Sequence, residues 1–457
     1  MNAIGSRPLS GVRIIDASHV FAIPYATSLL AQLGAEVIKI QNHVRADVMS
    51  SFGPFPENVP GERPWDRVGC LNTVNRGKRG LSLDISKPDG AEVLRNLVRV
   101  SDVLAESFTP RVLKKLGLDY SALRAVNPRL VMLSNTGYGH TGPYSEYGSV
   151  ATSLEGTSGM CWLSGYEDVA PSKVGQSYTD FLACWNAVFA ILVSLYRRNR
   201  TGTGQWIDLA MYQAGAATLG PQIMDFFSNS RVPARMGNRH GAYAPHGVYP
   251  CRGEDRWISI AVDSELAWER LCKAMDHPAW AADTALSTEA GRLADEARID
   301  RGLADWTRTQ DAQTLAVKLQ EEGIMAAPVQ NARDLLHDSQ LRSREFFRQV
   351  EHGPGSGIGA RPYLGVPWKL SASEGVNNSP APELGEHNRQ VLMDLLGYSA
   401  EDVESLFKRG IVGDSLPGTM RPLPLEEMRR SHRIGGHDAT YMELNSGQAA
   451  APSEDTR

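Results

Sequence analysis

The sequence predicts an α/β fold built on an open parallel sheet, because strand and helix patterns alternate along its first half. GVRIIDAS (Gly11–Ser18) is typical of a buried strand. YATSLLAQL (Tyr25–Leu33) predicts a helix that ends at Gly34, and EVIKI (Glu36–Ile40) predicts a second strand. A strand, a helix and a strand within about 30 residues form a βαβ unit, whose two strands run parallel.

The same alternation continues toward the C-terminus. Further strands are expected at Leu81–Asp84, Asp102–Ala105, Leu130–Ser134 and Trp206–Met211, and further helices at Asp89–Val98, Pro110–Leu116 and Asp180–Arg198. The last of these is the most apolar stretch of the chain. It begins with an acid and ends with two arginines, an order that suits the helix dipole. Helices on both faces of the sheet are therefore expected.

Changes in composition divide the chain into four parts. Residues 1–225 are predicted to form the N-terminal part of a large domain, and residues 226–345, with a strand at Trp257–Val262 and several amphipathic helices, a smaller α+β domain. Residues 346–413 are predicted to return to the large domain. Residues 414–457 are rich in proline, serine and charge, which predicts a mostly disordered tail.

Composition excludes several classes of protein. The 457 residues carry 47 basic and 52 acidic side chains, a net charge of −5, which argues against nucleic-acid binding. No apolar run approaches the ~18 residues of a membrane span, so neither a membrane protein nor an exported one is expected. The five cysteines are widely spaced and form no C-x-x-C pair, which predicts a reducing, cytoplasmic location without disulfides or zinc.

Three patterns that suggest common sites do not fit their surroundings. GSGIGA (Gly355–Ala360) is flanked by prolines, so no helix can begin there to bind a dinucleotide. TGTGQ (Thr201–Gln205) leads from a helix into a strand, the wrong order for anion binding at a helix N-terminus. The eleven histidines never form H-x-x-x-H, and no metal site is predicted.

Two positions remain as candidate sites. The first turn, SHVFAIP (Ser18–Pro24), follows the carboxyl end of a strand, where open sheets bind ligands, and His19 there either contacts a phosphate or caps the strand. Asp180 opens the apolar helix and is either a helix cap or a nucleophile, since the dipole should keep it ionised. The cations of Asn75–Arg79 and Arg111–Lys115 either bind a polyphosphate or form a solvated surface.

Seven segments, in order, resemble the class III (CaiB/BaiF-type) CoA-transferase family, which contains formyl-CoA transferase, carnitine CoA-transferase and α-methylacyl-CoA racemase. Together they span nearly the whole chain before the tail. The segments are Pro8–Ile40, Asn75–Gly90, Ser101–Tyr120, GYGHTGPY at Gly137–Tyr144, LYRRNRTGTGQWIDLAM at Leu195–Met211, GIMAAPVQN at Gly323–Asn331 and Leu384–Leu406.

The resemblance implies a Rossmann-like, CoA-binding large domain built from both ends of the chain, with a smaller inserted domain. It also implies an interlocked homodimer, with active sites where one subunit's large domain meets the other's small domain. A heteromer with a paralogous chain is the alternative. Coenzyme A and its acyl esters would be substrates, and no permanently bound cofactor is implied.

Site residues follow from the same motifs. The position that matches the family's nucleophile is Asp180. The positions that match CoA contacts are His19, Val20 and Ala22 in the first turn and Ser107, Phe108 and Lys115 further on. Phe21 stands where formyl-CoA transferases have a polar residue, which disfavours a small polar acyl group.

The implied reaction moves CoA from an acyl-CoA donor, with succinyl-CoA as one candidate, to a carboxylic acid through an aspartyl-CoA thioester. GNRHGAYAPHGVYPC (Gly237–Cys251) resembles the substrate loop of transferases for larger carboxylates, including the succinyl-CoA:benzylsuccinate type. An acyl-CoA racemase is the first alternative, although Tyr147–Val150 lacks the histidine of the racemases, which leaves open whether His140 replaces it. A non-catalytic CoA-binding subunit is the second alternative.

Overall fold

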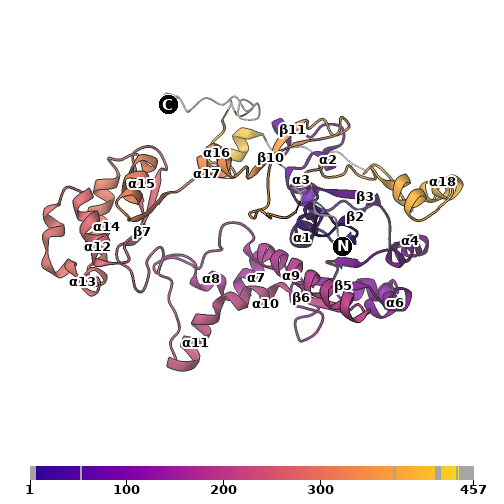
Figure 1. Cartoon of the computed structure of the whole chain (residues 1–457), viewed down its shortest axis with the longest axis horizontal. Coiled ribbons are helices and arrows are strands. Elements are labelled where there is room, and N and C mark those ends of the chain that lie inside the picture. Colours follow the sequence, from indigo (N-terminus) through magenta and orange to yellow (C-terminus); the bar gives the residue numbers. More distant parts are fainter. Residues whose placement is uncertain (1–6, 52–53, 374–376, 417–423, 439–440, 442–457) are drawn as a thin grey trace. The chain divides into compact units, whose positions relative to one another are not determined.

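The computed structural model describes residues 7–51, 54–373, 377–416, 424–438 and 441. The chain divides into two compact units (Figure 1). Unit 1 comprises Met1–Ser158, Gly175–Thr218 and Gln340–Arg457, and unit 2 comprises Gly159–Val174 and Leu219–Ser339. Unit 1 therefore combines both ends of the chain with an internal segment.

Unit 1 is built on a six-stranded sheet in which every neighbouring pair of strands is parallel. Its strands are β1 (Arg13–Ala17), β2 (Glu36–Gln41), β3 (Lys78–Ser82), β4 (Val103–Glu106), β5 (Val131–Thr136) and β6 (Trp206–Ala210). Their order is β3-β2-β1-β4-β5-β6, which confirms the predicted open parallel sheet. The order reverses between β1 and β4, and ligands of such sheets bind at that reversal, beyond the carboxyl ends of the strands.

The other elements of unit 1 are mostly helices and short turns. The helices are α1 (Ala22–Gln32), α2 (Pro64–Arg67), α3 (Gly69–Val74), α4 (Pro88–Arg99), α5 (Arg111–Lys115), α6 (Tyr120–Val126), α7 (Ala151–Thr157), α9 (Tyr178–Thr201), α10 (Met211–Ala216), α18 (Ala400–Lys408) and α19 (Leu425–Arg430), with 3-10 turns η1 (Val48–Ser51) and η2 (Pro56–Asn58) and a π-helix η6 (Gln390–Leu395). An antiparallel pair, β10 (Phe347–Glu351) and β11 (Ala360–Leu364), completes the unit. Two short elements, η3 (Ala217–Leu219) and α17 (Ser339–Ser343), cross the boundary to unit 2.

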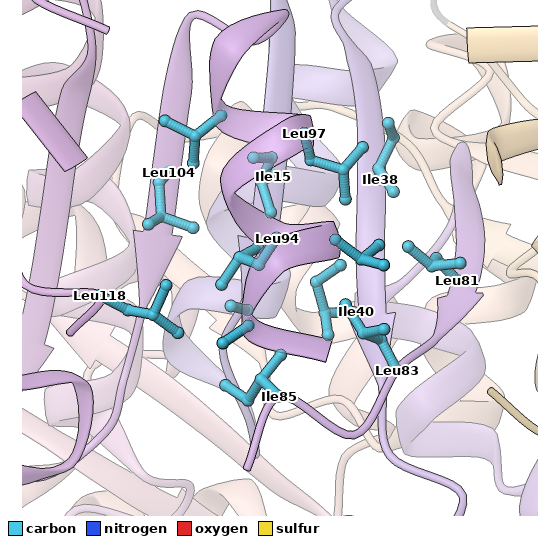
Figure 2. Packing of buried hydrophobic residues seen from close by; sticks show 14 of the residues in the cluster. Ile15, Ile38, Ile40, Leu81, Leu83, Ile85, Leu94, Leu97, Leu104 and Leu118 are labelled. Atoms are coloured by element: carbon cyan, nitrogen blue, oxygen red, sulfur yellow. The ribbon is translucent and has the colours of Figure 1, made fainter. Parts of the chain in front are cut away.

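Hydrophobic side chains bury both faces of the sheet, as a parallel sheet requires. On one face, Leu94 and Leu97 of α4 pack with Ile15 and Ile38 of the central strands (Figure 2). Ile14, next to Ile15, belongs to the cluster on the opposite face, which α1 and α9 cover. Successive side chains of a strand point to opposite faces, so β1 contributes to both cores.

The apolar helix α9 corrects one expectation drawn from composition. By length and composition alone it qualifies as a membrane span, since 18 of its 24 residues reach a mean hydropathy of 1.5, so the prediction that no apolar run approaches that length was wrong. Half of that window is buried within the fold, and Cys184, Ala187 and Ile191 belong to the core beside β1 and β4. Core helices of folded domains pass the same test.

Unit 2 contains a small antiparallel sheet in the order β7-β8-β9, with β7 at His246–Pro250, β8 at Trp257–Ala261 and β9 at Met325–Pro328. Its helices are α8 (Met160–Leu163), α11 (Gly220–Asn229), α12 (Glu265–Ala274), α13 (Glu289–Ala294), α14 (Glu296–Thr307), α15 (Ala312–Glu321) and α16 (Ala332–His337), with 3-10 turns η4 (Ala279–Ala282) and η5 (Thr284–Ser287). The hydrophobic core of unit 2 contains Ile258, Ile260, Leu271 and Leu303.

The predicted disordered tail, residues 414–457, is described only at 414–416, 424–438 and 441. Within that part, Leu425–Arg430 forms α19, with two acids in its first turn and two arginines in its last. This charge order favours a helix. The rest of the predicted tail lies outside the described residues.

Candidate active site

The residues that follow β1 and β4 meet at the point where the strand order reverses. The backbone N–H of His19 donates a hydrogen bond to Oγ of Ser107 over 2.9 Å. The ring of His19 lies edge-on to the ring of Phe108, with 5.3 Å between the ring centroids. Three of the residues predicted to contact CoA are therefore brought together at the edge where this sheet type binds ligands.

Val20, the next residue of the turn, has a left-handed backbone conformation with φ of +69°. This conformation costs a β-branched residue roughly 1–3 kcal/mol, so other contacts must hold it in place. The carboxylate of Asp47 accepts the N–H of Val20 over 3.0 Å and lies 3.6 Å from Nδ1 of His19. Burial acts to raise the pKa of Asp47, but hydrogen bonds from His19, Met49 and Val20 outweigh it and lower that pKa to about 2.

A buried ionic network lies directly behind the turn. Oδ2 of Asp16 accepts hydrogen bonds from Nζ of Lys78 at 2.8 Å and from Oγ1 of Thr27 at 2.7 Å. Oδ1 accepts the N–H of Ser18 at 3.0 Å and lies 3.3 Å from Nζ of Lys39. Burial acts to raise the pKa of Asp16, but the charges of both lysines outweigh it and hold that pKa far below its usual range. The network fixes the end of β1 and the start of the turn.

The sequence leaves open whether the cations of Asn75–Arg79 bind a polyphosphate or form a solvated surface, and the structure shows that two of them are buried. Arg76 is 2% exposed and donates to a backbone carbonyl of β11 over 2.5 Å. Lys78 belongs to the network of Asp16, and Arg79 forms an ion pair with Glu36 at 2.9 Å. Arg76 and Lys78 are buried and bound within the fold, so these two cations have a structural role.

Asp180 is the third residue of α9 and is 8% exposed. Burial and the charge of Glu155 raise its pKa and a hydrogen bond from Ser177 lowers it, with a net rise to about 6. From the dipole alone the sequence predicts an ionised carboxylate, but burial and Glu155 shift the pKa the other way. The carboxylate is therefore ionised only above about pH 6.

Glu155, on α7, is a member of this site that the sequence-based reasoning missed. Its side chain is fully buried, and Oε1 accepts the N–H of Tyr178, the first residue of α9, over 2.7 Å. Leu154 and Ala183 belong to one buried cluster, which packs α7 against α9. One signal was available, because Glu155 is the only charged residue between Glu146 and Glu167.

Aromatic contacts connect the first turn with the start of α9. The rings of Phe21 and Phe181 lie 5.0 Å apart between centroids, and Tyr25 contacts both at 5.6 and 6.0 Å. Phe181 directly follows Asp180. The candidate nucleophile and the predicted CoA-binding turn are thus neighbours, although 155 residues lie between Pro24 and Asp180 in the sequence.

The two remaining predicted contacts differ in their placement. Ala22, the first residue of α1, is 4% exposed and belongs to the buried cluster with Leu154 and Ala183. Lys115 is the last residue of α5, which follows Phe108 by a short turn, and its side chain is exposed. Ala22 can therefore offer a ligand its backbone only, whereas Lys115 is a cation available at the surface.

A pocket opens beside the first turn and is lined by His19, Asp47, Trp65 and Asn72 among others. Its volume, with the open mouth included, is about 630 Å³, which is in the range of ligand sites. In the part of the chain that the structure describes, no three His, Cys, Asp or Glu side chains lie close enough to hold a metal ion.

His140 lies on the β6 side of the sheet. Its backbone N–H donates to the carboxylate of Asp208 at 3.0 and 3.1 Å, and its ring lies edge-on to Trp206 with 5.2 Å between centroids. Burial lowers the pKa of His140. These contacts hold the imidazole against β6, and none of them involves Asp180 or the first turn.

Known proteins resemble this chain over most of its length. Residues 9–388 match the model of CoA-transferase family III. The succinate–glutarate CoA-transferase of Agrobacterium fabrum is 33% identical over 389 residues, which cover 85% of this chain and 96% of that protein. The beta subunit of the succinyl-CoA–L-malate CoA-transferase of Chloroflexus aurantiacus is 30% identical over 407 residues, 89% of this chain and 98% of that one.

Solved structures agree with the sequence relatives. The crystal structure of a CaiB/BaiF family protein from Brucella suis superimposes with a TM-score of 0.78 at 31% identity, over 85% of this chain and all of that one. Both the sequence and the fold therefore match along more than four-fifths of the chain. The chain belongs to CoA-transferase family III and is an enzyme of that family.

Proposed function

We propose that this enzyme moves CoA from succinyl-CoA to a dicarboxylic acid through an aspartyl-CoA thioester on Asp180. The observation that carries the proposal is the position of Asp180, a buried carboxylate of raised pKa beside the turn at the strand-order reversal. The names of the two relatives support the substrates, since they pair succinate or succinyl-CoA with glutarate or L-malate, which are dicarboxylic acids.

The proposed reaction uses only carboxylate and thiolate chemistry. The carboxylate of Asp180 attacks the thioester carbonyl, which gives a mixed anhydride and CoA thiolate. The thiolate then attacks the aspartyl carbonyl, so that succinate leaves and Asp180 carries CoA as a thioester. The acceptor carboxylate attacks that thioester and forms a second anhydride, from which the thiolate takes the acyl group and frees Asp180. Over the whole cycle one thioester is broken and one thioester is formed, so no ATP is consumed.

The surroundings of Asp180 suit both halves of this cycle. A carboxylate with a raised pKa is a stronger nucleophile than an exposed one and is still ionised at neutral pH. With only 8% of Asp180 exposed, few water molecules can reach an anhydride formed there. Hydrolysis would otherwise waste the energy of the thioester.

We place CoA in the crevice beyond β1 and β4, against the backbone of His19, Val20 and Ala22. Two observations support this placement. The strained turn is held rigid by Asp47, which leaves its remaining backbone groups fixed toward a ligand, and the pocket beside it has the size of a ligand site. Ser107 and Phe108 form the other wall, and Lys115 is the exposed cation that would meet a phosphate.

Two features support a dimeric enzyme, interlocked as the family resemblance implies. One face of α9 exposes apolar side chains, of which Phe189 is 67% and Tyr196 64% exposed. In unit 2, α11 has no buried residue and exposes Phe227 at 86%. Patches of this kind are typical of contact surfaces.

The proposed partner is a second copy of this chain, and a paralogous chain is the alternative. Light scattering of the purified protein should therefore give twice the chain mass of 49.9 kDa. A monomer at micromolar concentration would contradict the proposed dimer.

The cysteines support a cytoplasmic enzyme. Four of the five cysteines, Cys70, Cys184, Cys251 and Cys272, are free thiols. Free thiols are usual in proteins of reducing compartments.

A transfer assay tests the proposed reaction. With succinyl-CoA as donor, we expect glutarate or L-malate to become CoA thioesters as fast as succinate is released, without ATP. The kcat/KM for these acceptors should exceed that for acetate and butyrate by at least about tenfold, because a site that binds the second carboxylate would lose that contact. Solvent deuterium at the α-carbon of the acyl group without any acceptor would instead support a racemase. Binding of CoA without turnover would support a non-catalytic subunit.

A further inference from the structure

We propose that Glu155 is a positioning residue for the nucleophile: it fixes the first turn of α9 and places a second buried carboxylate near Asp180. The inference rests on the proposed function, because it assigns Glu155 a role through Asp180. It adds a residue from a different helix to the site.

A side chain of α7 forms a hydrogen bond at the start of α9. The first N–H groups of a helix lack partners within the helix and are usually bound by a capping side chain. Ser177 precedes α9, but its side chain does not cap the helix. Oε1 of Glu155 accepts the N–H of Tyr178 over 2.7 Å instead. The turn that carries Asp180 is therefore fixed by a side chain of α7.

The side chain of Glu155 is buried more completely than capping requires. Its side chain has no exposed surface, and Oε2 has no hydrogen-bond partner among the residues that the structure describes. Burying an unpaired carboxylate oxygen lowers the stability of the fold. Capping alone does not require a buried charge, because a neutral acceptor such as the side-chain carbonyl of glutamine could accept the N–H of Tyr178 at lower cost. A capping role therefore explains neither the unpaired oxygen Oε2 of Glu155 nor its negative charge.

The charge of Glu155 also affects the electrostatic surroundings of Asp180. Glu155 is the anion that acts on it, from α7. The thiols of Cys184 on α9 and Cys70 on α3 also face Asp180, but burial raises their pKa values to about 12 and 11, so both are neutral at physiological pH. Ser177 opposes the effect of Glu155 with a hydrogen bond. Removal of the Glu155 charge should therefore move the titration of Asp180 to lower pH.

The test uses Glu155→Gln, whose side-chain carbonyl can still accept the N–H of Tyr178 while the charge is lost. The measurement is kcat/KM for succinyl-CoA against pH, which reports the titration of the free enzyme. The wild type should lose activity below about pH 6. We call the fall of kcat/KM at low pH the acidic limb of the profile. In Glu155→Gln this acidic limb should lie about 1 pH unit lower than in the wild type. The melting temperature of the variant should equal or exceed that of the wild type.

Two further variants separate positioning from simple capping. Glu155→Ala removes both the charge and the hydrogen bond, so we expect the same shift of the acidic limb together with a lower melting temperature. Glu146→Gln removes an exposed carboxylate of the same unit that pairs with Arg111, and it should leave the limb in place. A role as a cap alone predicts a lower melting temperature for Glu155→Ala and an unchanged limb in both Glu155 variants.

The outcomes distinguish this inference from the function on which it rests. An acidic limb that stays in place in folded Glu155→Gln and Glu155→Ala would overturn the inference, as would loss of the fold in the isosteric Gln variant. Transfer activity that still depends on Asp180 would leave the proposed function intact in either case. Activity that survives Asp180→Asn would overturn both.

Discussion

Asp180→Asn should abolish CoA transfer and, at the same time, stabilise the fold at neutral pH. The amide has no negative oxygen with which to attack the thioester, so we expect kcat to fall by at least about 1000-fold. Binding of CoA should change little, because the first turn and Ser107 do not depend on the charge of Asp180. Steady-state kinetics with succinyl-CoA and a CoA-binding titration measure the two effects separately.

The gain in stability follows from the raised pKa of Asp180. Its carboxyl binds a proton more readily in the folded protein than in the unfolded chain, so the fold loses stability as the pH rises between about 4 and 6, and the full cost persists above pH 6. Asparagine carries no charge and removes this cost, about 2–3 kcal/mol above pH 6. Urea denaturation at pH 5 and pH 8 should show a larger gain at pH 8.

A matched control is Asp394→Asn, which changes an exposed aspartate of the same unit. It should alter neither turnover nor stability, because surface substitutions usually fall within about 0.5 kcal/mol. An Asp180→Asn variant with more than a tenth of wild-type turnover would exclude Asp180 as the nucleophile. A variant less stable than the wild type at pH 8 would contradict the electrostatic account of the site.

The largest loss of stability is expected for Asp16→Asn. This change leaves Lys39 and Lys78 buried without their shared counter-charge, and breaking a buried ion pair costs about 3–5 kcal/mol. It also weakens the contacts of the turn, because Asp16 accepts the N–H and the hydroxyl of Ser18. Urea denaturation at pH 7.5 should show a midpoint far below that of the wild type.

The control for Asp16 is Thr27→Val, which removes a single hydrogen bond to the same carboxylate and should cost about 1 kcal/mol. Since the pKa of Asp16 is lower in the folded than in the unfolded protein, its contribution is present above about pH 4 and is lost as the pH falls below that value. The difference between wild type and Asp16→Asn should therefore shrink at low pH. A loss of less than 1 kcal/mol at pH 7.5 would show that the network does not hold the fold.

Local patterns in the sequence predict the strands and helices of this molecule, because these elements depend on interactions between residues that are close in the sequence. The strands around Ile14 and Ile38 and the apolar helix from Asp180 follow from hydrophobic periodicity and helix-end charges, and the structure shows a parallel sheet with helices on both faces. The turn at His19 is identified as a site because it follows a strand of a parallel sheet.

The rest of the site depends on tertiary contacts that no local pattern contains. Asp47 and Glu155 reach Val20 and Tyr178 only because the fold brings separate segments together. The same reason explains why neither reading of Asn75–Arg79 included the ion pair of Lys78, since a cluster of cations has one sequence pattern whether it faces solvent or a buried partner such as Asp16. Burial, which raises the pKa of Asp180, is likewise a property of the folded chain.

The most direct test of the account is the intact mass of the enzyme after incubation with succinyl-CoA in the absence of an acceptor. If an aspartyl-CoA thioester forms, the mass of the enzyme should rise by the mass of CoA minus water. Hydroxylamine should remove the added mass, and peptide mapping should place it on the peptide that contains Asp180. The Asp180→Asn variant should gain no such mass. A protein that releases succinate and turns over acceptors without ever gaining this mass, or that gains it at another residue, would contradict the assignment of Asp180.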